Sequence, residues 1–162
     1  MSGHHLAQIN VGRLLAPVGD PLVAEFVASL DRVNALADAQ AGFVWRLTGA
    51  GNDATDIRPD PGDALQAINV SVWESLEALA AFVYRSDHLG VMRRRREWFA
   101  APAEAYMTLW WVPAGHRPDM AEGLERLRLL RANGPSRLAF TFRQPFPAPG
   151  GAEEAPILDE CA

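Results

Sequence analysis

The chain of 162 residues contains no lysine, so all fifteen of its basic residues are arginine. A Schiff base, a lysine-bound pyridoxal cofactor and a P-loop all need a lysine amine and are therefore excluded. The single cysteine, Cys161, stands next to the last residue. One cysteine cannot form an intrachain disulfide, and its place in an expected disordered tail argues against a thiol nucleophile or a cysteine-rich zinc site.

Long apolar runs are also missing. No stretch approaches the ~20 residues that a membrane-spanning helix needs, and residues 1–5 lack the apolar core of a signal peptide. We therefore expect a cytoplasmic protein without a membrane partner. The net charge of −5 argues against a nucleic-acid partner, although Arg93–Arg96 form a basic run. The length and the 49% hydrophobic content fit one soluble domain, which we place at residues 5–147, with a disordered tail at 148–162.

The order of periodic segments predicts an α+β fold of the ferredoxin-like βαββαβ type. Such a fold is an antiparallel sheet with helices on one face. The chain adds a C-terminal helix and a candidate edge strand over 138–143. The expected strands cover residues 5–14, 43–48, 67–73 and 105–112, and the expected helices cover 21–39, a short segment after Ser75, 86–99 and 119–132. Asp20, Ser75 and the Asn133–Pro135 stop supply the helix-end signals.

The segment from Tyr84 to Phe99 carries the strongest indication of a binding site. At about 100° per residue, an apolar half of the helix surface emerges, and His88 and Arg95 fall in the middle of it. Burying a charged group is costly unless it is paired or borders a wet cavity or a ligand. The pattern therefore predicts a pocket. The apolar half consists of Leu89, Val91, Met92, Trp98 and Phe99.

Three of the expected strands have one face that mixes amides, hydroxyls and aromatic rings. Such a face is either a wetted surface or the wall of a polar and aromatic cavity, and strand periodicity alone leaves both open. The candidate substrate-binding residues are those of the mixed faces together with two helix residues: Gln8, Asn69, Ser71, Trp73, Tyr106, Thr108, Trp110, Met92 and Phe99. Asn10, on the first strand, joins His88 and Arg95 as a candidate catalytic residue.

Several of these motifs resemble a bacterial family of unknown function, DUF3291, from about His5 to Pro147. The segments that carry the resemblance are His5–Asn10, Gly42–Arg46, Asn69–Ser75, Tyr84–His88, Arg94–Phe99 and Trp110–Pro118. That family resembles the dimeric α/β-barrel superfamily, which includes the antibiotic-biosynthesis monooxygenases. The resemblance implies a homodimer in which two sheets pair, and a pocket between each sheet and its own helices. Because that superfamily hosts oxygenases, haem-degrading enzymes, lyases and cyclases, the fold does not fix the reaction.

Haem-degrading members of the superfamily offer a specific comparison. They use an asparagine on the first strand and a tryptophan at the end of the third, and Asn10 and Trp73 resemble both. Their iron-ligating histidine falls near Arg93 in this chain, whereas His88 lies about one turn earlier. We therefore predict no cofactor and no metal, and keep haem with His88 as its ligand as the alternative.

Each charged candidate has a structural interpretation beside the functional one. His88 is a general base, a haem ligand or a hydrogen-bonded core histidine. Arg95 binds a carboxylate, phenolate or enolate, or it forms a salt bridge to Asp87, Glu74 or a partner-subunit acid.

The leading hypothesis is a monooxygenase-like enzyme that takes a proton from a hydrophobic, aromatic small molecule, with cofactor-independent oxygenation as one outcome. The alternatives are a haem protein, a non-catalytic small-ligand-binding module, and an isomerase, cyclase or lyase that uses the same site.

Overall fold

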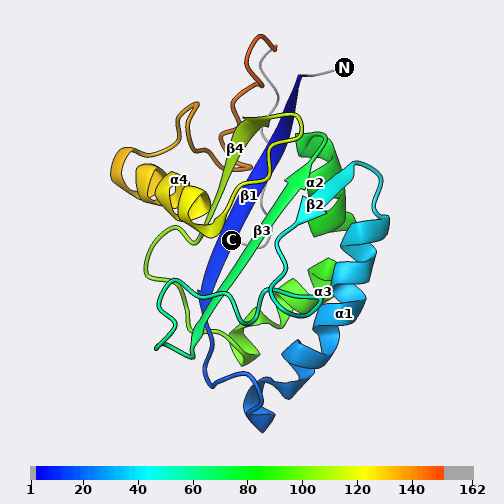
Figure 1. Cartoon of the computed structure of the whole chain (residues 1–162), viewed down its shortest axis with the longest axis vertical. Coiled ribbons are helices and arrows are strands. Elements are labelled where there is room, and N and C mark those ends of the chain that lie inside the picture. The colour runs from blue at the N-terminus through cyan, green and yellow to red at the C-terminus, as the bar shows by residue number, and fades with distance from the viewer. Residues whose placement is uncertain (1–2, 152–162) are drawn as a thin grey trace.

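The computed structural model describes residues 3–151 and contains a four-stranded antiparallel sheet in the order β2-β3-β1-β4 (Figure 1). The strands are β1 (His4–Arg13), β2 (Phe43–Arg46), β3 (Gln66–Trp73) and β4 (Met107–Pro113). The helices are α1 (Ala24–Ala39), α2 (Leu76–Arg85), α3 (His88–Arg93) and α4 (Met120–Asn133), with 3-10 turns at Pro21–Val23 and Arg95–Glu97. The ferredoxin-like βαββαβ order followed by a C-terminal helix is confirmed.

Local side-chain signals set the helix ends. Asp20 accepts a hydrogen bond from the backbone of Leu22 at 2.8 Å, which opens the turn before α1. Ser75 caps α2 and Asp119 caps α4, each through a hydrogen bond from a backbone N–H in the first turn. Gly134 ends α4 with a φ of 72°, a conformation that favours glycine. These ends match the positions expected from the sequence.

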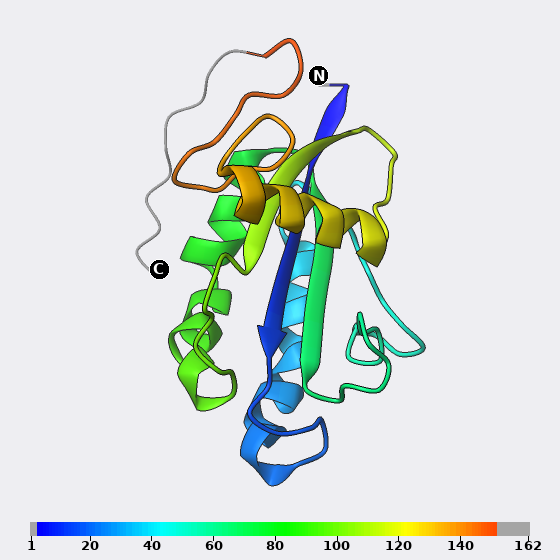
Figure 2. The same cartoon turned by 90° about the vertical axis from the view of Figure 1, so that its left-hand side faces the viewer.

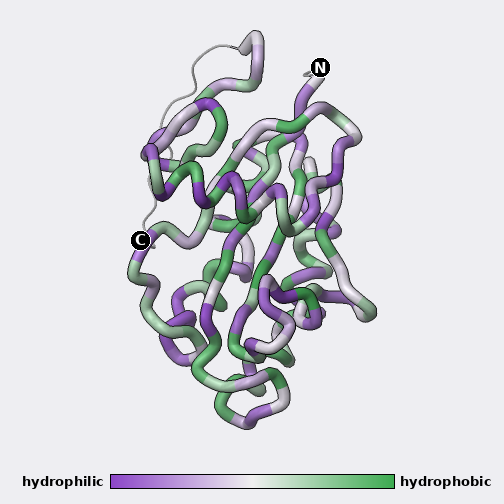
Figure 3. Tube along the Cα trace, turned by 60° about the vertical axis from the view of Figure 1, so that its left-hand side comes forward, coloured by the Kyte–Doolittle hydropathy of each residue, from purple (hydrophilic) through white to green (hydrophobic). Residues whose placement is uncertain are grey.

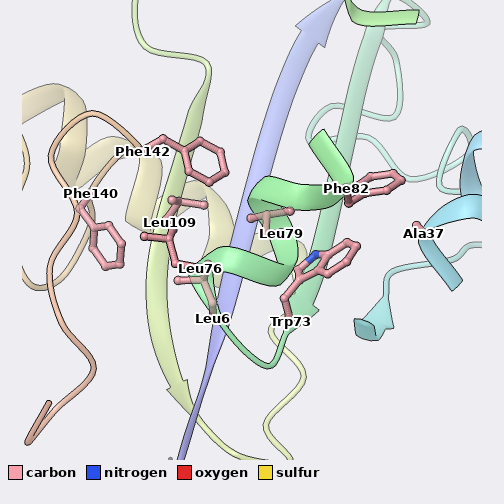
Figure 4. Packing of buried hydrophobic residues seen from close by; sticks show 9 residues of the cluster. All are labelled: Leu6, Ala37, Trp73, Leu76, Leu79, Phe82, Leu109, Phe140 and Phe142. Atoms are coloured by element: carbon pink, nitrogen blue, oxygen red, sulfur yellow. The ribbon is translucent and has the colours of Figure 1, made fainter. Parts of the chain in front are cut away.

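The two faces of β1 look in opposite directions. Leu6 packs with Leu76, Leu79 and Phe82 of α2 (Figure 4), so its face of the strand looks toward α1, α2 and α3. Gln8 and Asn10 share that face by the two-residue period, and they lie opposite Ser71 and Asn69 of β3. The other face carries Ala7 and Ile9, which pack with Leu127 of α4.

Helix α4 therefore covers the sheet on the side opposite α1, α2 and α3, as the turned view shows (Figure 2). Ala7, Val70 and Trp110 on this face are 0% exposed within the single chain. At Gly123 of α4, a Cβ would lie 2.7 Å from Cδ1 of Ile9, so the glycine permits the close approach. The expectation of helices on one face holds for α1–α3. The homodimer stays a prediction. Helix α4 of the same chain already covers the sheet face opposite α1–α3.

The helix expected over 86–99 is instead two short pieces, α3 and the 3-10 turn at Arg95–Glu97. The segment leaves the helical path because it pairs with the chain that continues β1. Phe99 forms an antiparallel bridge with Leu14, and the N–H of Leu15 donates to the carbonyl of Trp98 at 2.8 Å. Trp98 is 3% exposed, in a small core beside the start of α1.

The candidate edge strand at 138–143 is reduced to a bridge between Phe140 and Leu109 of β4, with both backbone hydrogen bonds at 2.8 Å. Of the predicted disordered tail, residues 152–162 lie outside the described residues. Hydrophobic and hydrophilic residues interleave along the trace (Figure 3). No helix in residues 3–151 is long and apolar enough to cross a membrane.

Candidate functional site

A cavity of about 210 Å³ lies between the sheet and helices α1–α3. It is lined by the β1 and β3 side chains of the mixed strand faces, by residues of α3 and by the segment that follows it. The predicted site residues that line the cavity are Gln8, Asn10, Asn69, Ser71, Trp73, His88, Met92, Arg95, Phe99 and Tyr106. The structure thus brings the three candidate catalytic residues to one cavity.

Thr108 and Trp110 lie elsewhere, which corrects their assignment to the site. They pair with Ile9 and Ala7, so they sit on the face of β4 that α4 covers. The indole N–H of Trp110 donates to the Glu122 carboxylate of α4 at 3.0 Å. On β4 the cavity side belongs to Met107, which lies opposite Asn10. Periodicity sorts a strand into two faces, but a polar or aromatic face can equally lie under a helix.

His88 is the first residue of α3. Its backbone N–H donates to the Ser86 hydroxyl at 3.1 Å, and that hydroxyl donates to the carbonyl of Phe82. The imidazole ring packs against the Phe82 ring with centroids 4.7 Å apart. Burial lowers the pKa of His88, and a backbone hydrogen bond with Val83 opposes this shift. At neutral pH the ring is therefore uncharged, and its Nδ1 has no hydrogen-bond partner in the described part of the chain.

Arg95 has no carboxylate within ion-pair distance among residues 3–151, and neither Asp87 nor Glu74 pairs with it. Asp87 pairs instead with Arg32 at 3.6 Å. The guanidinium carbon lies 4.9 Å from the centre of the Phe99 ring and 4.4 Å from that of Tyr106. Burial lowers the pKa of Arg95 and the Tyr106 side chain raises it, but a guanidinium stays charged in proteins.

Gly12 on β1 is a site residue that the sequence analysis did not single out. A Cβ at this position would lie 2.6 Å from Cδ1 of Phe99 and 3.4 Å from Nη2 of Arg95. Glycine therefore makes the space in which the Phe99 ring and the guanidinium sit against the sheet. An isolated glycine inside a strand pattern is the available signal, because it often marks a close approach.

A chain of hydrogen-bonded side chains runs across the sheet wall of the cavity. The amide nitrogen of Gln8 donates to Asn69 Oδ1 at 2.5 Å and to the Ser71 hydroxyl at 2.8 Å. The amide of Asn10 donates to Gln8 Oε1 at 3.3 Å, and the indole of Trp73 donates to Ser71 Oγ at 2.8 Å. These contacts hold four polar side chains and one indole in fixed orientations.

Aromatic rings continue the cavity wall from the sheet to α3. Phe43 meets Trp73 edge-on with ring centroids 5.3 Å apart. Trp73 stacks on Phe82 with centroids 5.2 Å apart, and Figure 4 shows these two rings. Phe82 in turn contacts His88. Ring surfaces of this kind suit a flat, apolar ligand. Within residues 3–151, no group of three or more His, Cys, Asp or Glu side chains gathers as a metal site would require.

A family model, DUF3291 (a domain of unknown function), matches residues 5–156 of the chain. A search of curated protein sequences with this chain found no match.

Several solved structures are similar in fold. SnoaB, a cofactor-independent oxygenase from Streptomyces nogalater, is 15% identical over 74% of this chain and 98% of its own, with a TM-score of 0.47. Rv0793 from Mycobacterium tuberculosis is 14% identical over 71% of this chain and 99% of its own, with a TM-score of 0.47. A presumptive antibiotic biosynthesis monooxygenase from Nitrosomonas europaea is 12% identical over 74% and 98%, with a TM-score of 0.48. Identities this low say nothing about shared chemistry.

Proposed function

The chain belongs to the DUF3291 family, and we propose that it is an enzyme that takes a proton from a hydrophobic, aromatic small molecule. The observation that carries this proposal is that His88 and Arg95 line the same cavity. An imidazole with a lowered pKa and an arginine without a carboxylate partner in the described residues both line it. A base and a cation are the two groups that forming a bound anion requires.

His88 is the base. Because burial keeps its pKa low, the ring at neutral pH is uncharged and has a lone pair with which to accept a proton. The proton leaves an acidic C–H or O–H of the substrate for the imidazole. The electron pair of the broken bond stays on the substrate as an enolate or phenolate.

Arg95 stabilises that anion. None of its five N–H donors has an acceptor among residues 3–151, so the guanidinium can give two of them to one oxygen-bearing group of the ligand. The rings of Phe99 and Tyr106 shield part of the guanidinium from solvent, which strengthens the attraction. Asn10 adds an amide to the same cavity and orients the substrate oxygen.

Reaction with dioxygen is the fate that we propose for the anion. An activated CH₂ group then becomes a carbonyl: one oxygen atom enters the product, and the other leaves as water with the two hydrogens. The substrate supplies both electron pairs, so no external reductant is needed. Without dioxygen, the same anion leads to isomerisation, cyclisation or elimination.

Deuterium exchange tests the proton step separately from its outcome. Aromatic ketones with an acidic C–H beside the carbonyl, beginning with 2-indanone, are incubated in D₂O with wild type or with His88→Ala and followed by NMR. We expect wild type to accelerate exchange and His88→Ala to lose most of that acceleration. An oxygen electrode then reports whether dioxygen is consumed. Ligand binding with no accelerated exchange would make the protein a binding module.

A further inference from the structure

The hydroxyl of Ser71 receives two hydrogen bonds. Gln8 Nε2 and Trp73 Nε1 each donate to Ser71 Oγ at 2.8 Å. Ser71 is 6% exposed and lines the cavity. A serine hydroxyl has two acceptor positions and one hydrogen to donate. Both acceptor positions are therefore filled, and the hydrogen needs an acceptor of its own.

Neither donor can serve as that acceptor. An indole N–H only donates, so Trp73 fixes the direction of its bond. The two hydrogens of the Gln8 amide go to Asn69 and Ser71, and its oxygen accepts from Asn10 and makes no hydrogen bond with Ser71. No other side chain or backbone oxygen in the described residues accepts from Ser71. The hydroxyl hydrogen is thus left for a molecule in the cavity.

Other donors of the cavity wall are in the same situation. Nε of Arg95 is buried without an acceptor among residues 3–151, and within the same residues the only side-chain hydrogen bond of Asn69 is the one that its Oδ1 accepts from Gln8. Asp53 also lines the cavity, but its Oδ1 accepts from the backbone N–H and the hydroxyl of Thr55 at 2.9 and 2.6 Å. These donors share the cavity with one acceptor already described, Nδ1 of His88, which also has no partner in the described residues.

We propose that Ser71 is a specificity-determining residue that donates its hydroxyl hydrogen to a carbonyl oxygen of the ligand. The cavity then selects flat, hydrophobic molecules with two separate oxygen acceptors: an anionic oxygen for Arg95 and a neutral carbonyl for Ser71. Amines and other donor-rich molecules are rejected, because they would leave these donors unpaired. The inference rests on the proposed function only in placing the ligand in this cavity.

Two coloured or fluorescent probes separate the two contacts. 2-Hydroxy-1,4-naphthoquinone carries an acidic oxygen and carbonyl groups on a flat frame, whereas 2-naphthoate carries the anionic group alone. Affinities are measured by titration calorimetry for wild type, Ser71→Ala and Ser71→Thr. We expect Ser71→Ala to lower the affinity for the hydroxyquinone by roughly 3- to 10-fold, the effect of one hydrogen bond. The same change should leave the affinity for 2-naphthoate unaltered. Ser71→Thr keeps the hydroxyl and should bind the hydroxyquinone as wild type does.

Each other outcome has a defined meaning. Equal losses for both probes would assign Ser71 a structural role through Trp73 and Gln8 and overturn the inference alone. Unchanged affinity for the hydroxyquinone would mean that the hydroxyl hydrogen is satisfied inside the protein, with the same consequence. If neither probe binds wild type, the inference and the proposed function fail together.

Discussion

Gly12 lies so close to the ring of Phe99 that no side chain fits between them. A Cβ on Gly12 would be 2.6 Å from Cδ1 of Phe99. The backbone φ of Gly12 is not positive, so space and not conformation requires a glycine here. Because Phe99 in turn supports the Arg95 guanidinium at 4.9 Å, this one missing methyl group sets where the charge of the cavity sits.

Gly12→Ala is therefore expected to harm the site more than the fold. The added methyl group pushes the Phe99 ring and the guanidinium away from β1, at a cost of about 1–3 kcal/mol in the free energy of unfolding. Accelerated deuterium exchange of 2-indanone should fall at least tenfold. Gly90→Ala in α3 is the matched control, because nothing lies within 4 Å of its added Cβ. The site assignment is contradicted if both variants exchange like wild type.

The pKa of His88 makes both activity and stability depend on pH. Burial places this pKa below its ordinary value of 6.5. The uncharged base should thus persist at slightly acidic pH, and the rate of exchange should fall only below pH 6.5.

Stability follows the same group with a definite sign. Between the two pKa values the unfolded chain binds a proton at His88 that the folded chain does not. The contribution of His88 is therefore present above pH 6.5 and is lost as the pH falls below it. Urea unfolding of wild type and His88→Gln across this range measures the difference. A constant difference between the two proteins would show that the folded pKa of His88 is ordinary.

Arg95→Met should separate ligand binding from stability. The methionine fills the space over Phe99 and Tyr106 without a charge, so the fold no longer holds a guanidinium that lacks a carboxylate in residues 3–151. We expect an unchanged or higher unfolding midpoint and an affinity for 2-naphthoate lowered by about 10- to 100-fold. Arg93→Met, at an exposed position of α3, serves as the control. A large loss of stability would instead mean that Arg95 has a structural partner.

Haemin should not bind as a specific ligand of His88. The cavity measures about 210 Å³, and a porphyrin macrocycle is a much larger ring system than the two-ring molecules that we propose as ligands. In addition, the imidazole packs against Phe82. Absorbance spectra with increasing haemin are expected to show no stoichiometric Soret shift. A shift that is present in wild type and absent in His88→Ala would make this a haem protein.

The sequence was most informative where chemistry is local. Asp20, Ser75 and Gly134 mark helix ends because their side chains or φ values act within one turn. The path after His88 could not be read in the same way. The helix ends before Arg94 because Phe99 pairs with Leu14, a residue far away in sequence. Helical periodicity depends only on neighbouring residues and cannot indicate such a partner.

The sequence predicted that polar and aromatic strand residues line a cavity, but it could not predict which face of each strand would do so. Asn69 and Ser71 alternate with valines, so the polar face of β3 was visible from the sequence. On β4, Thr108 and Trp110 present an equally polar and aromatic face, which α4 buries. Which face of a strand meets which helix depends on the whole topology. Gly12 was missed for a related reason: what matters there is the lack of a side chain, and only the packing of Phe99 against the strand shows that a side chain would not fit.

Gly123 in α4 offers a test of what covers the second face of the sheet. In Gly123→Leu the new side chain cannot fit, since even a Cβ would lie 2.7 Å from Cδ1 of Ile9, so α4 must lift from β1. Such overpacking costs about 1–3 kcal/mol of stability, and it exposes Ala7, Val70 and Trp110, which are 0% exposed in the intact chain. We therefore expect a lower urea midpoint and a larger mass in sedimentation than wild type.

The matched control for this change is Ala121→Leu, which adds the same kind of side chain at an exposed position of α4. It should leave both the midpoint and the mass unchanged. Once α4 lifts, Ala7, Val70 and Trp110 form an apolar face against which a second copy of the chain can pack. A gain in mass for Gly123→Leu alone would show that α4 keeps this face of the sheet from associating with a second copy. If the mass of Gly123→Leu equals that of wild type while its stability drops, α4 contributes packing but does not control association.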